Sequence, residues 1–140
     1  MNELDKMRSS DFYQLTAPEV EHYQEAGIIW NDEFRQGNNL DRPAQLLRLK
    51  MHLGALGDQA SFGTSFSYLN GPNIYIGHHF LAAGGLTIED AGEVHIGDNV
   101  VVEAGAVVAQ DLPANGVFAG IPAGKSLIWP MIADKCQLVV

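Results

Sequence analysis

Histidine is the residue type in this chain best suited to move a proton near neutral pH, because the ordinary pKa of imidazole is about 6.5. Three of the five histidines stand close together: His78 and His79 are adjacent, and His95 follows sixteen positions after His79. A histidine placed beside a hydroxyl group can remove its proton as a general base. His79 and His95 are therefore the candidate catalytic residues. The alternative interpretation is that they are exposed surface or interface histidines.

The same histidines do not predict a metal site. Adjacent side chains on an extended strand point to opposite faces, and no third ligand converges with His78 and His79. The single cysteine, Cys136, has no Cys or His at ligand spacing, and it cannot close an internal disulfide. His22 and His52 are interpreted as solvated or packing residues.

The elements that position these residues follow from a repeat. In the stretch IGDNVVVEAGAVVAQDLPA an aliphatic or small residue recurs at every sixth position, at Ile96, Val102, Val108 and Ala114. The same pattern extends back to Leu56, with two units lengthened from six to eight residues. A period of six fits neither an α-helix nor a hairpin, but it fits three short strands that close a triangular coil. We predict a β-solenoid over residues 56–125, with these apolar residues pointing inward.

The corners of each coil need residues that tolerate tight turns or positive φ. Gly97, Asp98 and Asn99 are of this kind, and we expect them to form one corner.

Residues 1–55 are predicted to form a helical segment. Thr16 and Glu19 have the spacing of a capping box, Pro18 suits a first turn, and Gly37 is a plausible end for this helix. A second helix is expected to follow Asp41, which can cap it. Two amphipathic helices alone bury too little surface to be stable, so we expect this hairpin to pack against the solenoid.

Composition limits the classes of partner. The chain has 140 residues, 46% hydrophobic and 18% charged, with a net charge of -9, which is ordinary for a globular protein but unfavourable for binding nucleic acid. No stretch approaches the ~18 apolar residues of a membrane span, and the charged amino terminus does not resemble a signal peptide. We expect a cytoplasmic protein that binds neither nucleic acid nor membrane. Residues 126–140 are unusually apolar, and we expect them to cover the last coil or a neighbouring subunit.

Several segments resemble the hexapeptide-repeat sugar O-acetyltransferases, the maltose and galactoside acetyltransferase group. They are KMRSSDFY, NIYIGHHF, LTIED, VHIGDNV and GAVVAQDLPANGVFAGIPA, and the resemblance covers roughly residues 5–125. It implies a mainly β fold, a left-handed parallel β-helix preceded by a helical hairpin. It also implies a homotrimer that binds acetyl-coenzyme A as co-substrate in a groove between subunits, with a sugar hydroxyl as the acceptor.

The resemblance further implies site residues. Asp90 matches an acceptor-binding position, while the backbone of Ala104, Gly105 and Ala106, together with Lys125, matches the coenzyme A groove. The histidine loop of the family, with about two coils around it, has no counterpart here. The hypothesis is an acetyl-coenzyme A-dependent transferase that uses His79 or His95 as its base. The alternative is a catalytically inactive trimeric β-helix that serves as a scaffold or binding protein.

Overall fold

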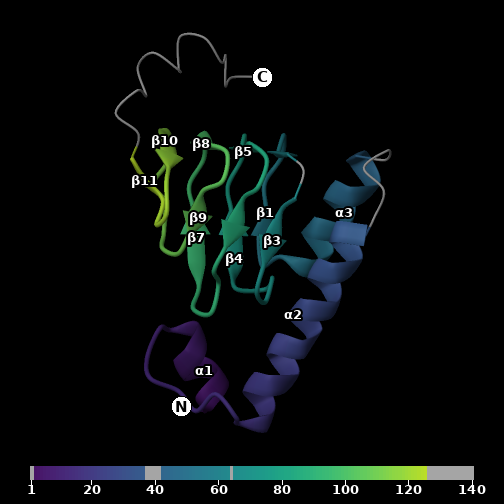
Figure 1. Ribbon diagram of the computed structural model, residues 1–140, viewed down its shortest axis with the longest axis vertical. Helices are drawn as coiled ribbons and strands as arrows, with labels where there is room; N and C mark the ends of the chain where they lie inside the picture. The colour runs from purple at the N-terminus through teal and green to yellow at the C-terminus, as the bar shows by residue number, and fades with distance from the viewer. Residues whose placement is uncertain (1, 37–41, 64, 126–140) are drawn as a thin grey trace.

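The computed structural model describes residues 2–36, 42–63 and 65–125. In this part of the chain, helices precede a solenoid of short strands, as Figure 1 shows. The helices are α1 (Glu3–Arg8), α2 (Pro18–Gln36) and α3 (Arg42–His52). The strands are β1 (Ala55–Leu56), β2 (Ser61–Phe62), β3 (Ser67–Tyr68), β4 (Ile74–Ile76), β5 (Leu81–Ala82), β6 (Thr87–Ile88), β7 (Val94–Ile96), β8 (Val100–Val102), β9 (Val107–Val108), β10 (Gly116–Ala119) and β11 (Gly124–Lys125).

The strands form the three walls of a triangular tube. Their orders are β1-β4-β7, β11-β10-β8-β5-β2 and β3-β6-β9, and all pairs are parallel except the antiparallel pair β10–β11. Ala55 pairs with Tyr75, and Tyr75 with His95, so that one coil takes twenty residues. Two units of six and one of eight give this length, which confirms the β-solenoid predicted from the repeat.

The interior of the tube holds more apolar residues than the repeat alone indicated. In β4 both Ile74 and Ile76 are buried, and in β7 both Val94 and Ile96 are buried, while the residue between them faces outward. Each wall thus contributes two inward side chains per coil, because side chains alternate along a strand.

The last coil departs from the sixfold spacing. Ala114 is exposed, and the prediction that it points inward is wrong. Leu112 is buried instead and bridges to Ile96, and Phe118 then pairs with Val102. The coil is shorter here, and the larger Leu112 side chain removes more apolar surface from water than Ala114 would.

One corner of the tube repeats a left-handed backbone conformation. Gln59, His79, Asn99 and Asn115 occupy equivalent positions in successive coils, with φ between 56° and 64°. Of the predicted corner residues Gly97, Asp98 and Asn99, only Asn99 has a positive φ.

The helical segment differs in detail from the prediction. α2 begins at Pro18, so Ala17 and not Thr16 holds the N-cap position, and the carbonyl of Ala17 accepts the N–H groups of Val20 and Glu21. Proline at the first helical position requires no hydrogen bond and therefore fixes this start. Gly37, Asp41 and residues 126–140, on which three predictions fall, lie outside the described residues.

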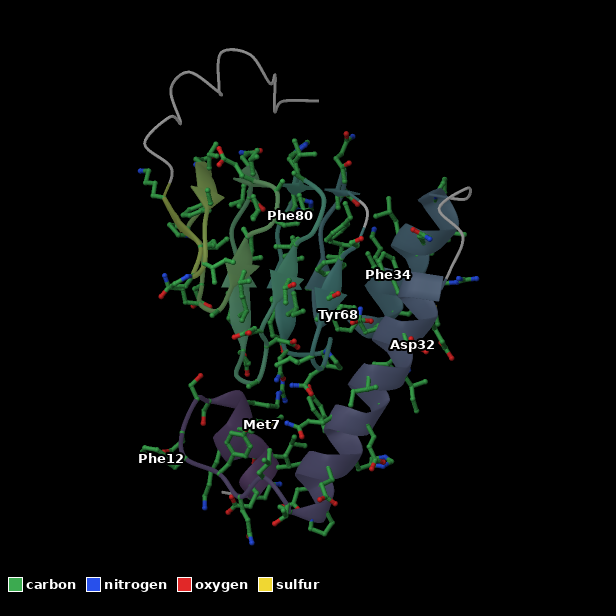
Figure 2. The ribbon with its side chains drawn as sticks, in the orientation of Figure 1. Met7, Phe12, Asp32, Phe34, Tyr68 and Phe80 are labelled. Atoms are coloured by element: carbon green, nitrogen blue, oxygen red, sulfur yellow. The ribbon has the colours of Figure 1, made fainter. Side chains whose placement is uncertain are left out.

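A short helix that the pattern did not reveal, α1, precedes α2. Asn2 caps it by accepting the N–H of Asp5 at 2.7 Å, and Met7 is buried against Ala17 and Val20 in a small second core. Figure 2 shows Met7 between α1 and α2. α2 runs along one side of the solenoid, where the ring of Phe34 meets that of Phe66 edge to face at 5.9 Å. No described helix is both long and apolar enough to cross a membrane.

Candidate functional site

His95 lies on the outer face of the wall β1-β4-β7. Its neighbours in β7, Val94 and Ile96, are buried, so alternation directs the imidazole outward, where about half of it is exposed. The ring stacks on that of Tyr75 in the preceding coil, with centroids 4.5 Å apart and planes within 5°. Nε2 of His95 lies 3.1 Å from Oε1 of Glu93. The imidazole is thus held by a ring on one face and a carboxylate at one nitrogen.

The carboxylate of Glu93 also faces a cation. Nη2 of Arg8 lies 3.7 Å from Oε2 of Glu93 and donates to the Tyr75 hydroxyl at 3.0 Å. The backbone N–H of Glu93 donates to the carbonyl of Arg8 at 2.9 Å. Arg8, the last residue of α1, therefore touches both residues that contact His95.

Asn73 joins this group to the interior. Its Oδ1 accepts from Nε of Arg8 at 3.0 Å and from the hydroxyl of Tyr23 at 2.8 Å, while its Nδ2 donates to the carbonyls of Asp90 and Ala91. Burial raises the pKa of Tyr23 to about 12, so its hydroxyl stays a proton donor at neutral pH. One buried amide thus ties α1, α2 and two coils together.

Asp90 is fully buried beneath this group. Its carboxylate accepts the backbone N–H groups of Leu69, Asn70 and Gly71 at 2.8 to 3.2 Å. Burial raises the pKa of Asp90, and the N–H donors oppose that rise without cancelling it. In this structure the carboxylate holds the backbone of the lengthened unit of the preceding coil and does not open onto the surface.

The other candidate base lies at a different place. His79 sits at the left-handed corner with φ 58°, and its Nδ1 is buried without a hydrogen-bond partner. Nδ1 of the neighbouring His78 accepts the N–H of Asp58 at 2.9 Å, which links two coils. Neither imidazole has the carboxylate at hydrogen-bond distance that His95 has, since the closest approach of His78 to a carboxylate, Asp58, is 3.9 Å.

The residues matched to the coenzyme A groove follow β8. Ala104 and Gly105 are exposed, and the space where a side chain of Gly105 would stand is open. The N–H of Gly105 donates to the carbonyl of Gly84, and that of Ala106 to Glu103. Lys125 is exposed on β11 at the edge of the same sheet. Open space and a cation are thus present at this corner. The N–H groups of Gly105 and Ala106, however, already donate to backbone carbonyls, one in the neighbouring coil and one in the same coil.

Within residues 55–125, apart from residue 64, the connections between strands are short. The longest runs over residues 109–115, and β7 is joined to β8 by residues 97–99 alone. The part of the chain that the structure describes contains no group of three or more His, Cys, Asp or Glu side chains arranged to hold a metal ion.

Arg8, Tyr75 and Glu93 were missed by sequence reasoning. Glu93 and His95 are two positions apart on a strand, which places them on one face, so this pair was within reach of the pattern. The contacts of Arg8 and Tyr75 were not, because they join residues 67 positions apart.

Comparison with known proteins agrees with this architecture. No family model matches the chain. A segment of 58 residues is 41% identical to the galactoside O-acetyltransferase of Escherichia coli strain K12, covering 41% of this chain and 25% of that protein. The chain thus spans about a quarter of the length of the curated relative that it matches.

Solved structures extend the likeness to most of the chain. A maltose O-acetyltransferase from Clostridium difficile 630 superposes with a TM-score of 0.61 at 20% identity, covering 90% of this chain and 96% of the other. A galactoside acetyltransferase in complex with coenzyme A gives a TM-score of 0.58 at 18% identity, covering 90% of each chain. At these identities the likeness establishes the fold.

The segment match and the superpositions together confirm the resemblance predicted from the sequence: this chain carries, in shortened form, the left-handed hexapeptide-repeat β-helix of the maltose and galactoside acetyltransferase group.

Proposed function

We propose that this chain is an O-acetyltransferase that transfers the acetyl group of acetyl-coenzyme A to a sugar hydroxyl, with His95 as the general base. The reaction class is supported by the 58-residue match to galactoside O-acetyltransferase and by the fold. The observation that carries the residue assignment is the contact of 3.1 Å between His95 and Glu93.

The proposed roles follow from that contact. A proton on Nε2 lies between the ring and the carboxylate of Glu93, which leaves Nδ1 as the basic nitrogen. Nδ1 removes the proton of the acceptor hydroxyl as its oxygen attacks the thioester carbonyl carbon. The new C–O bond forms, the C–S bond breaks, and the departing sulfur of coenzyme A receives the proton from the imidazolium. Glu93 keeps the ring oriented and stabilises its charge.

The co-substrate is assigned to the corner after β8. Exposed backbone at Ala104 and Gly105 leaves room for an extended ligand, and the Lys125 ammonium is suited to its phosphates. This assignment rests on the family match of these positions. The homotrimer, which would bring a neighbouring subunit to the same corner, belongs to the same proposal.

The first experiment titrates acetyl-coenzyme A into the protein by calorimetry and then measures thiol release with a panel of sugars. Heat of binding and sugar-dependent release are expected. His95→Ala should lower the release at least a hundredfold, because general-base catalysis contributes about 10²–10⁴ in rate. Glu93→Gln should lower it less. His22→Ala, which alters an exposed histidine on α2, is the control and should leave it unchanged.

A second candidate function is a catalytically inactive scaffold or binding protein. The observation that favours it is the shortness of the described connections between coils, which leaves no long loop to carry a base over the acceptor. Absence of both heat and thiol release would establish this alternative. Thiol release that persists in His95→Ala would instead refute the assignment of His95 as the base, while the proposed transferase activity would stand.

A further inference from the structure

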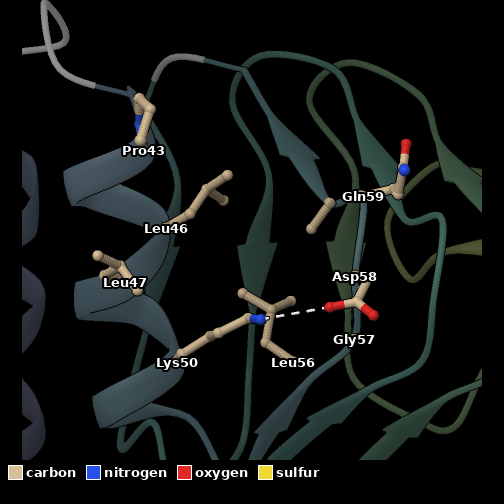
Figure 3. Close-up of a pocket in the computed structure, with 9 residues that line it drawn as sticks. Pro43, Leu46, Leu47, Lys50, Leu56, Gly57, Asp58 and Gln59 are labelled. Atoms are coloured by element: carbon tan, nitrogen blue, oxygen red, sulfur yellow. Dashed lines mark hydrogen bonds and ion pairs between the residues drawn. The ribbon is translucent and has the colours of Figure 1, made fainter.

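A groove lies between α3 and the first coil, away from His95. It encloses about 350 Å³ and its lining is mainly apolar, with Leu46 and Leu47 from α3 facing Leu56 and Ala60 from the coil. In Figure 3 the side chains of Leu46 and Leu56 lie in the gap between the helix and the strands. Leu47 is 64% exposed. A volume of this size is typical of ligand and peptide sites, and an apolar surface of this kind is stabilised when it is covered.

One ion pair stands at the edge of the groove. Nζ of Lys50 lies 3.5 Å from Oδ1 of Asp58, and both side chains are well exposed. The groove therefore combines an apolar floor with one cation and one anion at its side.

The sequence contains one segment with the same combination. Residues 126–140 follow the last described residue, and ten of these fifteen residues are apolar. The charged residues in this segment are Asp134 and Lys135, which are adjacent and opposite in sign. They can complement Lys50 and Asp58 while the flanking apolar residues cover the leucines.

The length of the segment permits this contact within one molecule. Lys125 lies in β11, and β2, beside the groove, is four strands away in the order β11-β10-β8-β5-β2. Four strand spacings amount to about 19 Å, whereas fifteen extended residues span about 50 Å. A connection across the edge of the tube is therefore long enough.

We propose that residues 126–140 bind in the groove between α3 and the first coil of the same molecule. The segment then connects the last coil to the first and covers apolar surface on both partners. This proposal is independent of the proposed catalytic activity.

The single cysteine of the chain provides the test. Ala60→Cys places a second thiol in the groove of the full chain, and oxidation with diamide should join it to Cys136 within one molecule. The product is a monomer of altered mobility on a non-reducing gel with both thiols lost. Ala104→Cys is the matched control, because Ala104 is exposed and follows β8, only two strands from β11. Cross-linking at position 60 should be at least tenfold faster than at position 104.

Equal rates at positions 60 and 104, or no cross-link at position 60, would overturn the proposal. A cross-linked dimer would also overturn it, because the occupant of the groove would then be the segment of a second copy.

A second measurement covers the case in which the cysteine variant does not fold. In a Trp30→Phe background, Trp129 is the remaining tryptophan, and its emission should lie at short wavelength, as for a buried indole. Leu46→Arg should shift this emission to longer wavelength. Phe12→Arg, which changes an exposed phenylalanine outside the groove, should not. An emission typical of exposed tryptophan in the background protein would contradict the proposal.

Discussion

At the scale of single residues, buried polar groups decide where the backbone of the coils can go. Asp90 is the clearest case, since its carboxylate binds three consecutive backbone N–H groups of the preceding coil. Those N–H groups belong to a lengthened unit, where the chain leaves the regular corner and needs other acceptors. The matched acceptor-binding position thus has a structural contact in this chain, which explains why a carboxylate is buried here.

Asp90→Asn should destabilise the fold by about 1–3 kcal/mol at neutral pH, because one carboxylate oxygen becomes an NH₂ that faces N–H donors. Chemical denaturation measures this. Asp11→Asn is the control, because Asp11 is exposed and the amide oxygen of asparagine can still accept the N–H of Phe12; it should change the free energy of unfolding by less than about 0.5 kcal/mol.

The pH dependence of the same carboxylate has a definite sign. Burial raises the pKa of Asp90 in the folded state above its unfolded value. The contribution of this group to stability is therefore complete below the unfolded pKa and is lost as pH rises through the folded pKa. The free energy of unfolding of the wild type minus that of Asp90→Asn should therefore be largest at acid pH. It should decrease as pH rises through the folded pKa of Asp90 and stay constant above it. A difference that grows with pH would show that the hydrogen bonds outweigh burial.

At the scale of elements, the solenoid sets positions and the helices adapt to it. α2 approaches the first lengthened unit so closely at Gly27 that a β-carbon there would lie 2.6 Å from Cα of Asn70. A glycine in the middle of a helix weakens it, and here the close packing of helix on coil accounts for the glycine.

Gly27→Ala should lower stability by about 1–3 kcal/mol through overpacking, even though alanine favours the helix by about 1 kcal/mol. Thermal and denaturant unfolding measure the change. Gly124→Ala is the control, because the space around that position is open. An unchanged or raised stability in Gly27→Ala would mean that α2 does not pack at this distance.

The last coil of the solenoid gives a second prediction at the scale of secondary-structure elements. Leu112→Ala should lower the free energy of unfolding by about 2–5 kcal/mol, as for other buried leucines. The reason is that Leu112, and not Ala114, is the buried residue that bridges to Ile96 in the last coil. Ala114→Ser should change stability by less than about 0.5 kcal/mol. If the sixfold pattern held to the end of the solenoid, the two effects would be reversed.

At the scale of the whole molecule, exposed apolar residues mark where other surfaces can attach. Ile28 and Ile29 of α2 and Leu69 of the adjacent corner are all exposed and line a shallow depression of about 280 Å³. This surface is distinct from the groove beside α3. We predict that this surface contributes to the subunit contact of the proposed homotrimer.

Ile29→Asp should shift the protein from trimer to monomer, because a carboxylate would be buried in the contact without a partner. Sedimentation or light scattering measures the mass. Met51→Asp, at an exposed position on α3, is the control and should leave the assembly intact. A trimer in Ile29→Asp would move the subunit contact to another face, and a monomeric wild type would refute the trimer.

The sequence by itself determined the coil. A period of six with two lengthened units allows few structures besides a three-sided solenoid, and the inward places of Ile96, Val102 and Val108 follow from that period. The outward direction of His95 follows from the same pattern, since His95 precedes the inward Ile96 and alternation along a strand is a local property.

The tertiary structure decided what local pattern cannot contain. The surroundings of His95 depend on how α1 packs, because Arg8 of α1 donates to Tyr75. The shortened coil depends on Leu112, and not Ala114, occupying the interior next to Ile96. Both outcomes arise from contacts between distant segments, whose energies are settled only when the whole chain is packed.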